Sequence, residues 1–511
     1  MNERVLIAGG GTMGAGIAAV AAAAGYDVDL VEADAGARSR LEPSARVTVY
    51  DAMPSQSDAT IAIEAIVEDL EAKRAVFAAF ESAVAADVPI CTNTSSLAVT
   101  EIASRLTRPE RALGLHFFNP PRKMALVEVV AGDRTDDATI ERGRAFVGAI
   151  GKTAVLAEDT PGFIVNRVAR PYYLQAMRAF AAGVAPVEDC DALARGAGFR
   201  MGPFELMDLI GLDVNLATSE SIYARTGEER LQPVALQRRM VAAGTLGRKT
   251  GSGFYDYAQG PPAHDDAPPP PPQDADESVV VIGFGAIADE MVELLGQTYA
   301  RVARVENDDL LDTIPLDATI AIDVGDGTTD RASVVRRLFD TLGPDAVVFV
   351  DAYATDLARC GSGDADRLVG YGVLGQLAAQ RVVEIVDSEG CSDDALELAQ
   401  ELFEALGKRV VLVADVPGLF LGRVVASVVN EAVTAVDEGV ATPDDIDVAM
   451  RLGTNYPLGP IAWGREIGGA RLARILNRLA AGEDAAFAPH RALWVLDAID
   501  DSVAPEEADV T

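Results

Sequence analysis

RVLIAGGGTMG at residues 4–14 decides the fold of the first half of the chain. A strand-like apolar run passes directly into glycines that match G-x-G-x-x-G, and small residues then continue to Gly25. In this motif the first glycine permits a tight turn, the second lets the backbone approach a pyrophosphate, and the third packs the helix against the strand. The pattern predicts a doubly wound parallel sheet with a dinucleotide turn made by Gly9, Gly11, Thr12, Met13 and Gly14.

The next strand-like segment, DVDLVE at residues 27–32, ends in an acid. Glu32 stands where a carboxylate binds the ribose 2′-hydroxyl of NAD and repels the 2′-phosphate of NADP. We therefore expect NAD rather than NADP as the cofactor. Without the glycines, Glu32 would be interpreted as a solvated strand end.

The same order of elements recurs in the second half. SVVVIGFGAIA at 278–288 repeats the strand and turn, VPGLFLGR at 416–423 repeats TPGFIVNR at 160–167, and residues 443–462 echo 187–206. From Arg111 to Asp191 the second copy follows at a near-constant offset of 256 residues. We predict an α/β Rossmann-type doubly wound sheet followed by an all-α domain, the pair being internally duplicated. Two unrelated α/β units are the alternative.

A linker separates the two copies. Residues 260–277, GPPAHDDAPPPPPQDADE, are rich in proline and acids, which favour an extended segment. We therefore divide the chain into a NAD-binding Rossmann domain, a helical C-terminal domain, the linker, a degenerate Rossmann-like domain, and a second, non-catalytic helical domain with its tail. The corresponding ranges are 1–157, 158–259, 260–277, 278–412 and 413–511.

Composition narrows the functional classes. The net charge of −36 argues against nucleic acid and anionic membranes as partners. No apolar run is long enough to cross a bilayer and the N-terminus does not resemble a signal peptide, so we expect a cytoplasmic protein. The four cysteines are far apart, and we expect neither disulfides nor a metal site. The acidic, lysine-poor composition fits either a high-salt cytoplasm or a GC-rich genome.

Three polar residues of the first half stand at or near strand ends, where such sheets hold ligands. Ser95 follows VPICTNT (88–94), and His116 and Glu128 lie in or beside apolar segments twelve residues apart. A histidine backed by a carboxylate is a general base, which the oxidation of a secondary alcohol requires. Spacing alone does not show that the two side chains meet, and each fits a structural role when taken singly.

Longer strings resemble those of a known family. TNTSSL (92–97), LGLHFFNP (113–120), TPGFIVNR (160–167), GFRMGPFELMDLIG (198–211) and RKTGSGFYDY (248–257) are similar to segments of the 3-hydroxyacyl-CoA dehydrogenases. The chain resembles above all the long bacterial form with a degenerate second half that is associated with phenylacetate degradation. The resemblance implies NAD-dependent oxidation of an (S)-3-hydroxyacyl-CoA, such as 3-hydroxyadipyl-CoA or 3-hydroxybutyryl-CoA, to the 3-oxoacyl-CoA in a β-oxidation type of fatty acid metabolism.

The resemblance also implies roles for single residues. His116 would be the base and Glu128 its partner. Ser95 and Asn119 would position both the reacting oxygen and the nicotinamide of NAD, and Asn166 would stabilise the reacting oxygen. Three further residues match positions that contact NAD in the family, namely Glu68, Lys73 and Lys249. Structural alternatives stay open for several of them: a helix cap for Ser95, a turn for Asn119, a helix surface for Asn166, and an ion pair with Glu68 or Asp69 for Lys73.

The second copy lacks most of this set. His116, Asn119 and Asn166 correspond to Gly372, Gly375 and Gly422, while Glu128 corresponds to Glu384. We therefore expect a non-catalytic second copy that binds no cofactor of its own. Because the helical domains of relatives pair between subunits, we expect either a homodimer or an intramolecular pseudo-dimer.

One departure from the family concerns coenzyme A. Between the second strand and IAIEAIVED the family carries a long helical arm that contacts CoA, whereas here only residues 33–60 fill the space, with Pro43 and Pro54 interrupting any long helix. The adenosine end of CoA would then lose contacts. The cations left as candidates for its phosphates are scattered: Arg38, Arg40, Arg46, Arg122 and Lys123.

Three functions remain as alternatives at this stage. The first is an acyl-CoA dehydrogenase of the kind described, with an acyl-CoA or related thioester as its substrate. The second is a dehydrogenase of a free 3-hydroxy acid or a non-CoA thioester, which the missing arm favours. The third is a non-catalytic binding protein on the same fold, against which the intact set of Ser95, His116, Asn119, Glu128 and Asn166 argues.

Overall fold

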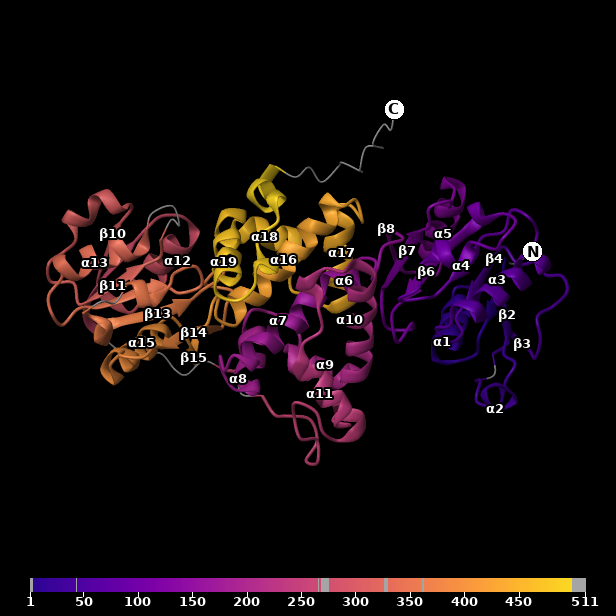
Figure 1. Ribbon diagram of the computed structural model, residues 1–511, viewed down its shortest axis with the longest axis horizontal. Helices are drawn as coiled ribbons and strands as arrows, with labels where there is room; N and C mark the ends of the chain where they lie inside the picture. Colours follow the sequence, from indigo (N-terminus) through magenta and orange to yellow (C-terminus); the bar gives the residue numbers. More distant parts are fainter. Residues whose placement is uncertain are drawn as a thin grey trace.

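The two sheets lie at opposite ends of an elongated molecule, and the helical domains of both copies lie between them (Figure 1). This computed structural model describes residues 3–498 apart from 43, 265, 268–274, 326–329 and 361–362. The predicted linker lies partly outside these residues, as do Pro43 and the tail from residue 499. No helix in the described part of the chain has the length and apolarity needed to cross a bilayer.

The first sheet has the strand order β3-β2-β1-β4-β5-β6-β7-β8, in which only β6 and β7 run antiparallel. Alternate residues of β1 face opposite sides: Val5 and Ile7 join one core, and Leu6 and Ala8 the other. The strands are β1 (Arg4–Ala8), β2 (Asp27–Val31), β3 (Val47–Tyr50), β4 (Ile61–Glu64), β5 (Ile90–Thr92), β6 (Ala112–Phe117), β7 (Leu126–Ala131) and β8 (Thr153–Glu158). The helices are α1 (Thr12–Ala23), α2 (Ala35–Arg38), α3 (Leu70–Ala83), α4 (Val99–Ala103) and α5 (Asp137–Ala149).

The second sheet repeats this order without a counterpart of β3. Its order is β10-β9-β11-β12-β13-β14-β15, again with a single antiparallel pair, β13 and β14. The matching topology confirms the predicted duplication. The strands are β9 (Ala275–Ile282), β10 (Tyr299–Val305), β11 (Ile320–Asp323), β12 (Val347–Asp351), β13 (Leu368–Gly372), β14 (Val382–Asp387) and β15 (Arg409–Ala414), with helices α12 (Ala286–Leu295), α13 (Arg331–Thr341), α14 (Leu357–Cys360) and α15 (Asp393–Ala405).

Two helical domains share one hydrophobic core in the middle of the molecule. In Figure 1, α7 and α16 lie side by side there, and they pack against each other. The first domain comprises α6 (Val165–Val168), α7 (Arg170–Ala181), α8 (Val187–Gly196), α9 (Pro203–Ile210), α10 (Leu212–Thr226) and α11 (Ala235–Ala242), and the second α16 (Leu421–Asp437), α17 (Pro443–Thr454), α18 (Pro460–Ile467) and α19 (Gly469–Gly482).

The structure differs from the sequence-based expectation at two segments. Residues 47–50 form the edge strand β3, because their backbone pairs with β2. The strand lies in the stretch between β2 and β4, where no strand was expected. Strand β9 begins at Ala275, inside the predicted linker, because Ala275 still pairs with Tyr299 of β10. The linker is also held at its centre, since Asp266 contacts Arg195 of α8 and Arg409 of β15.

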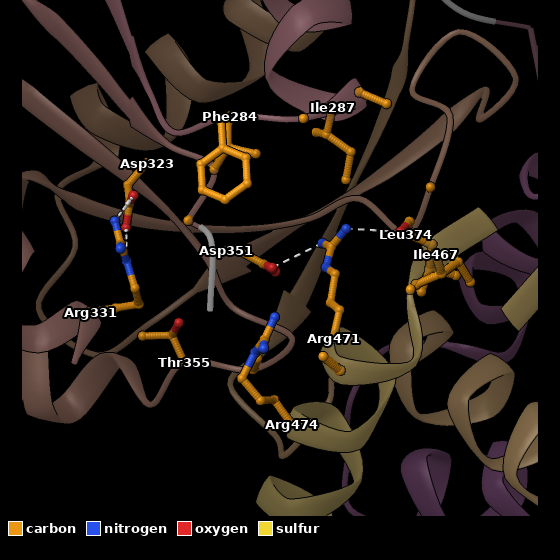
Figure 2. A pocket seen from close by; sticks show the side chains of 18 of the residues that line it. Phe284, Ile287, Asp323, Arg331, Asp351, Thr355, Leu374, Ile467, Arg471 and Arg474 are labelled. Atoms are coloured by element: carbon orange, nitrogen blue, oxygen red, sulfur yellow. Dashed lines mark hydrogen bonds and ion pairs between the residues drawn. The ribbon is translucent and has the colours of Figure 1, made fainter. Parts of the chain in front are cut away.

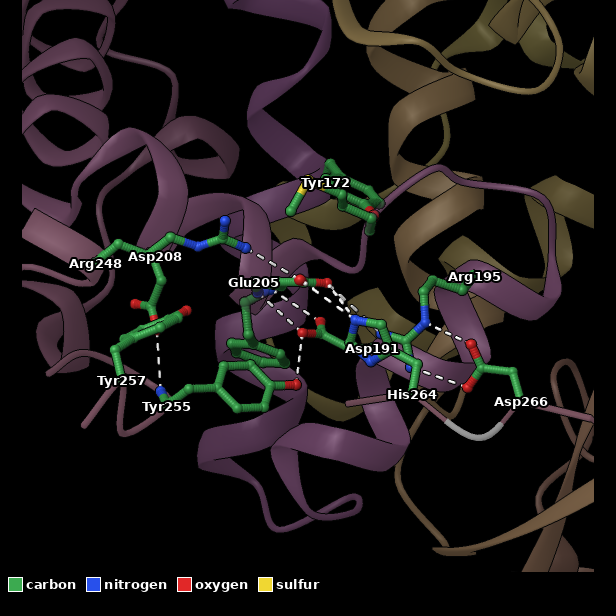
Figure 3. A network of polar contacts seen from close by, with 12 residues as sticks. Tyr172, Asp191, Arg195, Glu205, Asp208, Arg248, Tyr255, Tyr257, His264 and Asp266 are labelled. Carbon is green, nitrogen blue, oxygen red and sulfur yellow. Dashed lines mark hydrogen bonds and ion pairs between the residues drawn. The ribbon is translucent and has the colours of Figure 1, made fainter. Parts of the chain in front are cut away.

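Buried carboxylates fix the segments that carry the family-like strings of the first helical domain (Figure 3). Asp191 accepts hydrogen bonds from the N–H groups of Phe204 and Glu205 at the start of α9, and from the hydroxyl of Tyr255. Burial raises the pKa of Asp191 to about 7. In the second copy Asp447 holds the start of α18 in the same way, through the N–H groups of residues 461 and 462.

The two copies contact each other reciprocally, as the subunits of a two-fold dimer do. The N–H of Glu158 donates to the carbonyl of Val440, and the N–H of Ala414 donates to the carbonyl of Val184. Each of these residues is 256 positions from its equivalent. The sheet of each copy therefore contacts the helical domain of the other, and the chain forms an internal pseudo-dimer.

A buried ion pair lies at the centre of this interface. Glu431 of α16 accepts hydrogen bonds from Arg167 and Arg230 of the first copy, both at 2.7 Å. Burial alone would raise the pKa of Glu431, but the two guanidinium groups outweigh it and hold the pKa below its usual value. The equivalent contact, from Arg423 to Gln175, has no acid, and Arg423 is neutralised by Glu483 instead.

We expect Glu431→Gln to destabilise the helical core by about 3–5 kcal/mol, because two arginines would lose their buried counter-charge. Chemical unfolding followed by circular dichroism measures the loss. The matched control is Glu438→Gln, which removes a 45% exposed partner of Arg167 and should cost under about 1 kcal/mol. The difference between wild type and Glu431→Gln should shrink as the pH falls and Glu431 is protonated. Equal losses in the two variants would contradict this interpretation.

Candidate active site

Two glycines close the turn between β1 and α1. Gly9 has φ of +105°, and a Cβ there would lie 2.4 Å from the carbonyl oxygen of Ala65. A Cβ on Gly14 would lie 1.9 Å from the oxygen of Gly9, so helix and strand approach as closely as the motif requires. A Cβ on Gly11 would meet nothing within 4 Å. The N-terminus of α1 therefore faces open space, and its N–H groups fit the pyrophosphate of a dinucleotide.

Glu32 lies beside this turn, at the end of β2. Its carboxylate accepts hydrogen bonds from the N–H of Gly10 at 2.7 Å and from the N–H of Asp34 at 2.8 Å. The side chain is thus held at the edge of the dinucleotide turn, as the strand-end position predicts. A ribose hydroxyl arriving there would meet a carboxylate that is already oriented.

Glu68 organises the loop after β5. It accepts hydrogen bonds from the Thr94 hydroxyl and from the N–H groups of Ser95 and Ser96. Burial raises the pKa of Glu68, but Lys73 and the hydroxyl donors outweigh it and lower the pKa overall. Glu68 therefore positions the backbone that carries Ser95.

Lys73 is buried behind Glu68. Its Nζ lies 2.8 Å from Glu64 and 3.2 Å from Glu68, and its side chain is 1% exposed. It is therefore held between two acids, and one of the two structural alternatives from the sequence, pairing with Glu68, is present. The second copy has the same kind of pair, Asp323 with Arg331. Glu64 was missed by the sequence analysis, because a buried acid at a strand end has no distinctive pattern.

His116 and Glu128 meet across the antiparallel strands β6 and β7, where they are directly opposite each other. His116 Nδ1 lies 2.6 Å from Glu128 Oε2, and both side chains are buried. The other oxygen of Glu128 accepts hydrogen bonds from the N–H groups of Ile164 and Val165 at the start of α6. An Nδ1–H donating to the carboxylate leaves Nε2 with its lone pair, which is the form that a general base requires.

The other candidate residues differ in burial and in the segment that carries them. Asn119 is exposed just beyond the end of β6, and Ser95 is exposed on the loop that Glu68 holds. Asn166, half-buried, follows Val165 in α6. Lys249 stands apart: it pairs with Asp213 at the start of α10, within the helical domain rather than on the first sheet.

Sequence profiles match both parts of this architecture. The NAD-binding domain of 3-hydroxyacyl-CoA dehydrogenase matches residues 4–45 and 37–160, and the C-terminal domain of the same enzymes matches 162–257 and again 418–501. The chain belongs to the 3-hydroxyacyl-CoA dehydrogenase family. The first profile matches in two pieces that overlap at residues 37–45, in the segment between β2 and β3.

Relatives of this dehydrogenase cover either the whole chain or its first half. The 3-hydroxyadipyl-CoA dehydrogenase of Escherichia coli is 37% identical, over 93% of both chains. The human mitochondrial hydroxyacyl-coenzyme A dehydrogenase is 40% identical, over 50% of this chain and 91% of that one. The crystal structure of 3-hydroxybutyryl-CoA dehydrogenase from Escherichia coli has a TM-score of 0.76 and 34% identity, covering 98% of this chain and 99% of that one.

In the second copy of this family member, a tyrosine takes the place that His116 has in the first. The hydroxyl of Tyr353 donates to Glu384 at 2.6 Å, and Glu384 also accepts from the N–H of Phe420. A Cβ on Gly372 or Gly422 would lie within 2.7 Å of the Tyr353 ring. The two glycines that replace His116 and Asn166 therefore make room for this side chain.

What remains of the second cleft is a cavity of about 530 Å³ (Figure 2). Phe284 and Ile287 of the glycine turn line one side, and Arg471 and Arg474 of α19 come from the opposite side. Arg471 is engaged with Asp351 and with the carbonyl of Leu374. The cavity keeps the glycine turn, while Tyr353 is fully buried beside Glu384 and is not part of the described lining.

We expect the chain to prefer NAD over NADP at least tenfold in kcat/KM, equivalent to ~1.4 kcal/mol, because Glu32 would repel a 2′-phosphate. Glu32→Ala should remove most of this preference. Initial rates with each cofactor measure it. Asp34→Asn is the control, because Asp34 lies two residues further along and only caps α2. Equal use of both cofactors by wild type would contradict the assignment of Glu32.

We also expect one NADH per chain. Both turns are open at their middle glycine, but the second has Ala288 where the first has Gly14, and Tyr353 takes the place of His116 beside Glu384. Titration calorimetry gives the stoichiometry directly. Two equivalent sites, or loss of binding in a Phe284→Asp variant of the second turn, would show that the second copy holds the cofactor.

Proposed function

We propose that this chain oxidises the 3-hydroxyl of an (S)-3-hydroxyacyl-CoA to the 3-oxo group with NAD, and that His116 is the general base. The contact that carries the proposal is the 2.6 Å hydrogen bond between His116 and Glu128 in a buried site at the carboxyl edge of the first sheet. The open glycine turn on the same sheet supports NAD as the second reactant. The relatives described above are all named as dehydrogenases of CoA thioesters, and these names support a CoA substrate.

The residues of the candidate site have distinct roles in the proposed reaction. His116 Nε2 takes the proton of the substrate hydroxyl, and Glu128 stabilises the imidazolium that forms while fixing the ring. Ser95 on the loop after β5, Asn119 just beyond β6 and Asn166 of α6 orient the substrate oxygen. Phe118 and Phe163, whose rings lie 4.6 Å and 5.8 Å from that of His116, exclude water from one side. NAD, when bound, supplies the hydride acceptor.

The second copy has no base and takes a structural part in this proposal. Glu384 keeps its position but its partner is a tyrosine, whose pKa burial and Glu384 raise well above the usual value. Such a hydroxyl does not accept a proton near neutral pH. A dehydrogenase of a free 3-hydroxy acid is not favoured, because the relatives described above are named for CoA thioesters.

The duplication supplies a matched pair of substitutions. Glu128→Gln should lower kcat by about 10²–10⁴-fold, the usual contribution of a general base, because the imidazolium would lose its counter-charge. Glu384→Gln, at the equivalent position of the second copy, should leave kcat within twofold. His116→Gln should be as severe as Glu128→Gln while NADH binding is kept.

Reduction of acetoacetyl-CoA followed by NADH absorbance measures all three variants, and fluorescence titration measures NADH binding. A Glu128→Gln enzyme within a few-fold of wild type would refute the His116–Glu128 base. An effect of Glu384→Gln as large as that of Glu128→Gln would show that the carboxylate matters for stability rather than for proton transfer.

A further inference from the structure

A second hollow, of about 1440 Å³, lies over the outer face of α1. One bank is formed by residues within 37–42 and 44–49, which include part of β3. The other is formed by residues 120–123 and 149–152. The described lining includes neither His116 nor Ser95 nor Glu32. The hollow is therefore separate from the site of proton transfer, although it reaches the glycine turn at Gly10 and Gly11.

The charge of this hollow is opposite to that of the protein. Its lining holds one acid, Glu42, and five basic residues, whereas the whole chain has 79 acidic against 43 basic residues. Cations on both banks would attract a polyanion locally against a repulsive overall field. The five basic residues are Arg40, Arg46, Arg122, Lys123 and Lys152.

Four of these are among the cations that looked scattered in the sequence. The fifth of that set, Arg38, does not line the hollow: it donates to the backbone carbonyls of Glu32 and Ala33 and closes the turn before α2. Arg40 and Lys123 are exposed and form no ion pair within the described part of the chain. Arg122 reaches across to Glu42 in an exposed pair, which contributes little and would yield easily to a phosphate.

The floor between the banks is apolar. Small residues of α1 form it, Ala15, Ala19 and Ala22 among them, and Val49 of the edge strand is 41% exposed beside them. A flat base can lie on such a surface while its phosphates meet the cations at the rim. Apolar walls with a few charged groups are typical of sites for nucleotides and other small molecules.

The hollow is also connected to the active site by a short, anchored segment. Pro120 and Pro121 follow Asn119 directly, and Pro121 packs on α1 at Gly16, where a Cβ would lie 2.9 Å from its ring. Lys152 donates to the carbonyl oxygens of Pro121 and Met124 and so fixes the loop. A ligand in the hollow therefore lies next to the loop that carries Asn119.

We propose that this hollow binds the 3′-phosphoadenosine diphosphate end of the CoA thioester, in place of the missing arm. The inference rests on the proposed function for the identity of the thioester. The adenine lies on the alanine floor of α1, and Arg40, Arg122 and Lys123 contact the phosphates. The shortened segment 33–60 thus does not abolish nucleotide contacts but moves them to the side of α1.

The test uses adenosine 3′,5′-bisphosphate as a direct probe and the double variant Arg40→Ala/Lys123→Ala. Titration calorimetry should show at least a tenfold loss of affinity in this variant, ~1.4 kcal/mol, because charged contacts to phosphate are removed. The control is Arg238→Ala/Arg239→Ala on α11, which removes the same charge elsewhere and should stay within twofold of wild type. Equal affinity of wild type and the double variant would overturn the proposal.

A kinetic comparison separates this proposal from the proposed function. The ratio of kcat/KM for acetoacetyl-CoA over acetoacetyl-pantetheine should fall at least tenfold in the double variant, with the KM for NADH unchanged. An unchanged ratio, or a rise in the KM for NADH alone, would mean that the cations do not serve CoA. If wild type reduces neither thioester, the proposed function fails, whereas the bisphosphate titration still decides the fate of the hollow.

Discussion

A single buried carboxylate joins each sheet to its helical domain, and the active site is built on that joint. In the first copy Glu128 uses one oxygen for the backbone at the start of α6 and the other for His116. A buried carboxylate is tolerated only when its oxygens have partners, so the start of α6 and the strand β7 must keep one relative position. This constraint places Asn166, one residue after Val165, at a fixed position relative to the histidine.

The second copy keeps this joint between sheet and helical domain although it lacks the histidine. Glu384 still binds the backbone at Phe420, but the tyrosine hydroxyl of Tyr353 has replaced the imidazole. Burial raises the pKa of Glu384 to about 7, even with these donors in place. A carboxyl without a nearby cation is thus kept at a cost in this copy, because losing it would leave the helix N–H groups and the tyrosine hydroxyl without an acceptor.

Much of the fold and of the candidate site was predictable from the sequence, and the features that were not predicted have a common cause. The glycine turn and the duplication follow from local strings or from a near-constant offset along the chain, and the pairing of His116 with Glu128 was expected from the family resemblance. The position of Lys73 behind Glu68, the edge strand β3 and the role of Tyr353 depend on contacts between segments far apart in sequence. Gly372 and Gly422 indicated a lost function, yet only the packing shows that they make room for a ring. The gathering of Arg40 and Lys123 in one hollow was likewise hidden, because the cations come from both sides of α1.

The internal pseudo-dimer explains why a copy without a base is retained. The sheet of each copy hydrogen-bonds to the helical domain of the other, and Gly196 of α8 fits against Val382 of the second sheet, where a Cβ would lie 2.5 Å away. The helical domain that positions Asn166 is therefore buried partly by the second copy. Covalent linkage makes this association intramolecular and independent of protein concentration, and Asp266 of the linker strengthens it by bridging Arg195 and Arg409. The second copy thus contributes a contact surface that does not require a histidine, and Tyr353 stands in the place of that histidine beside Glu384.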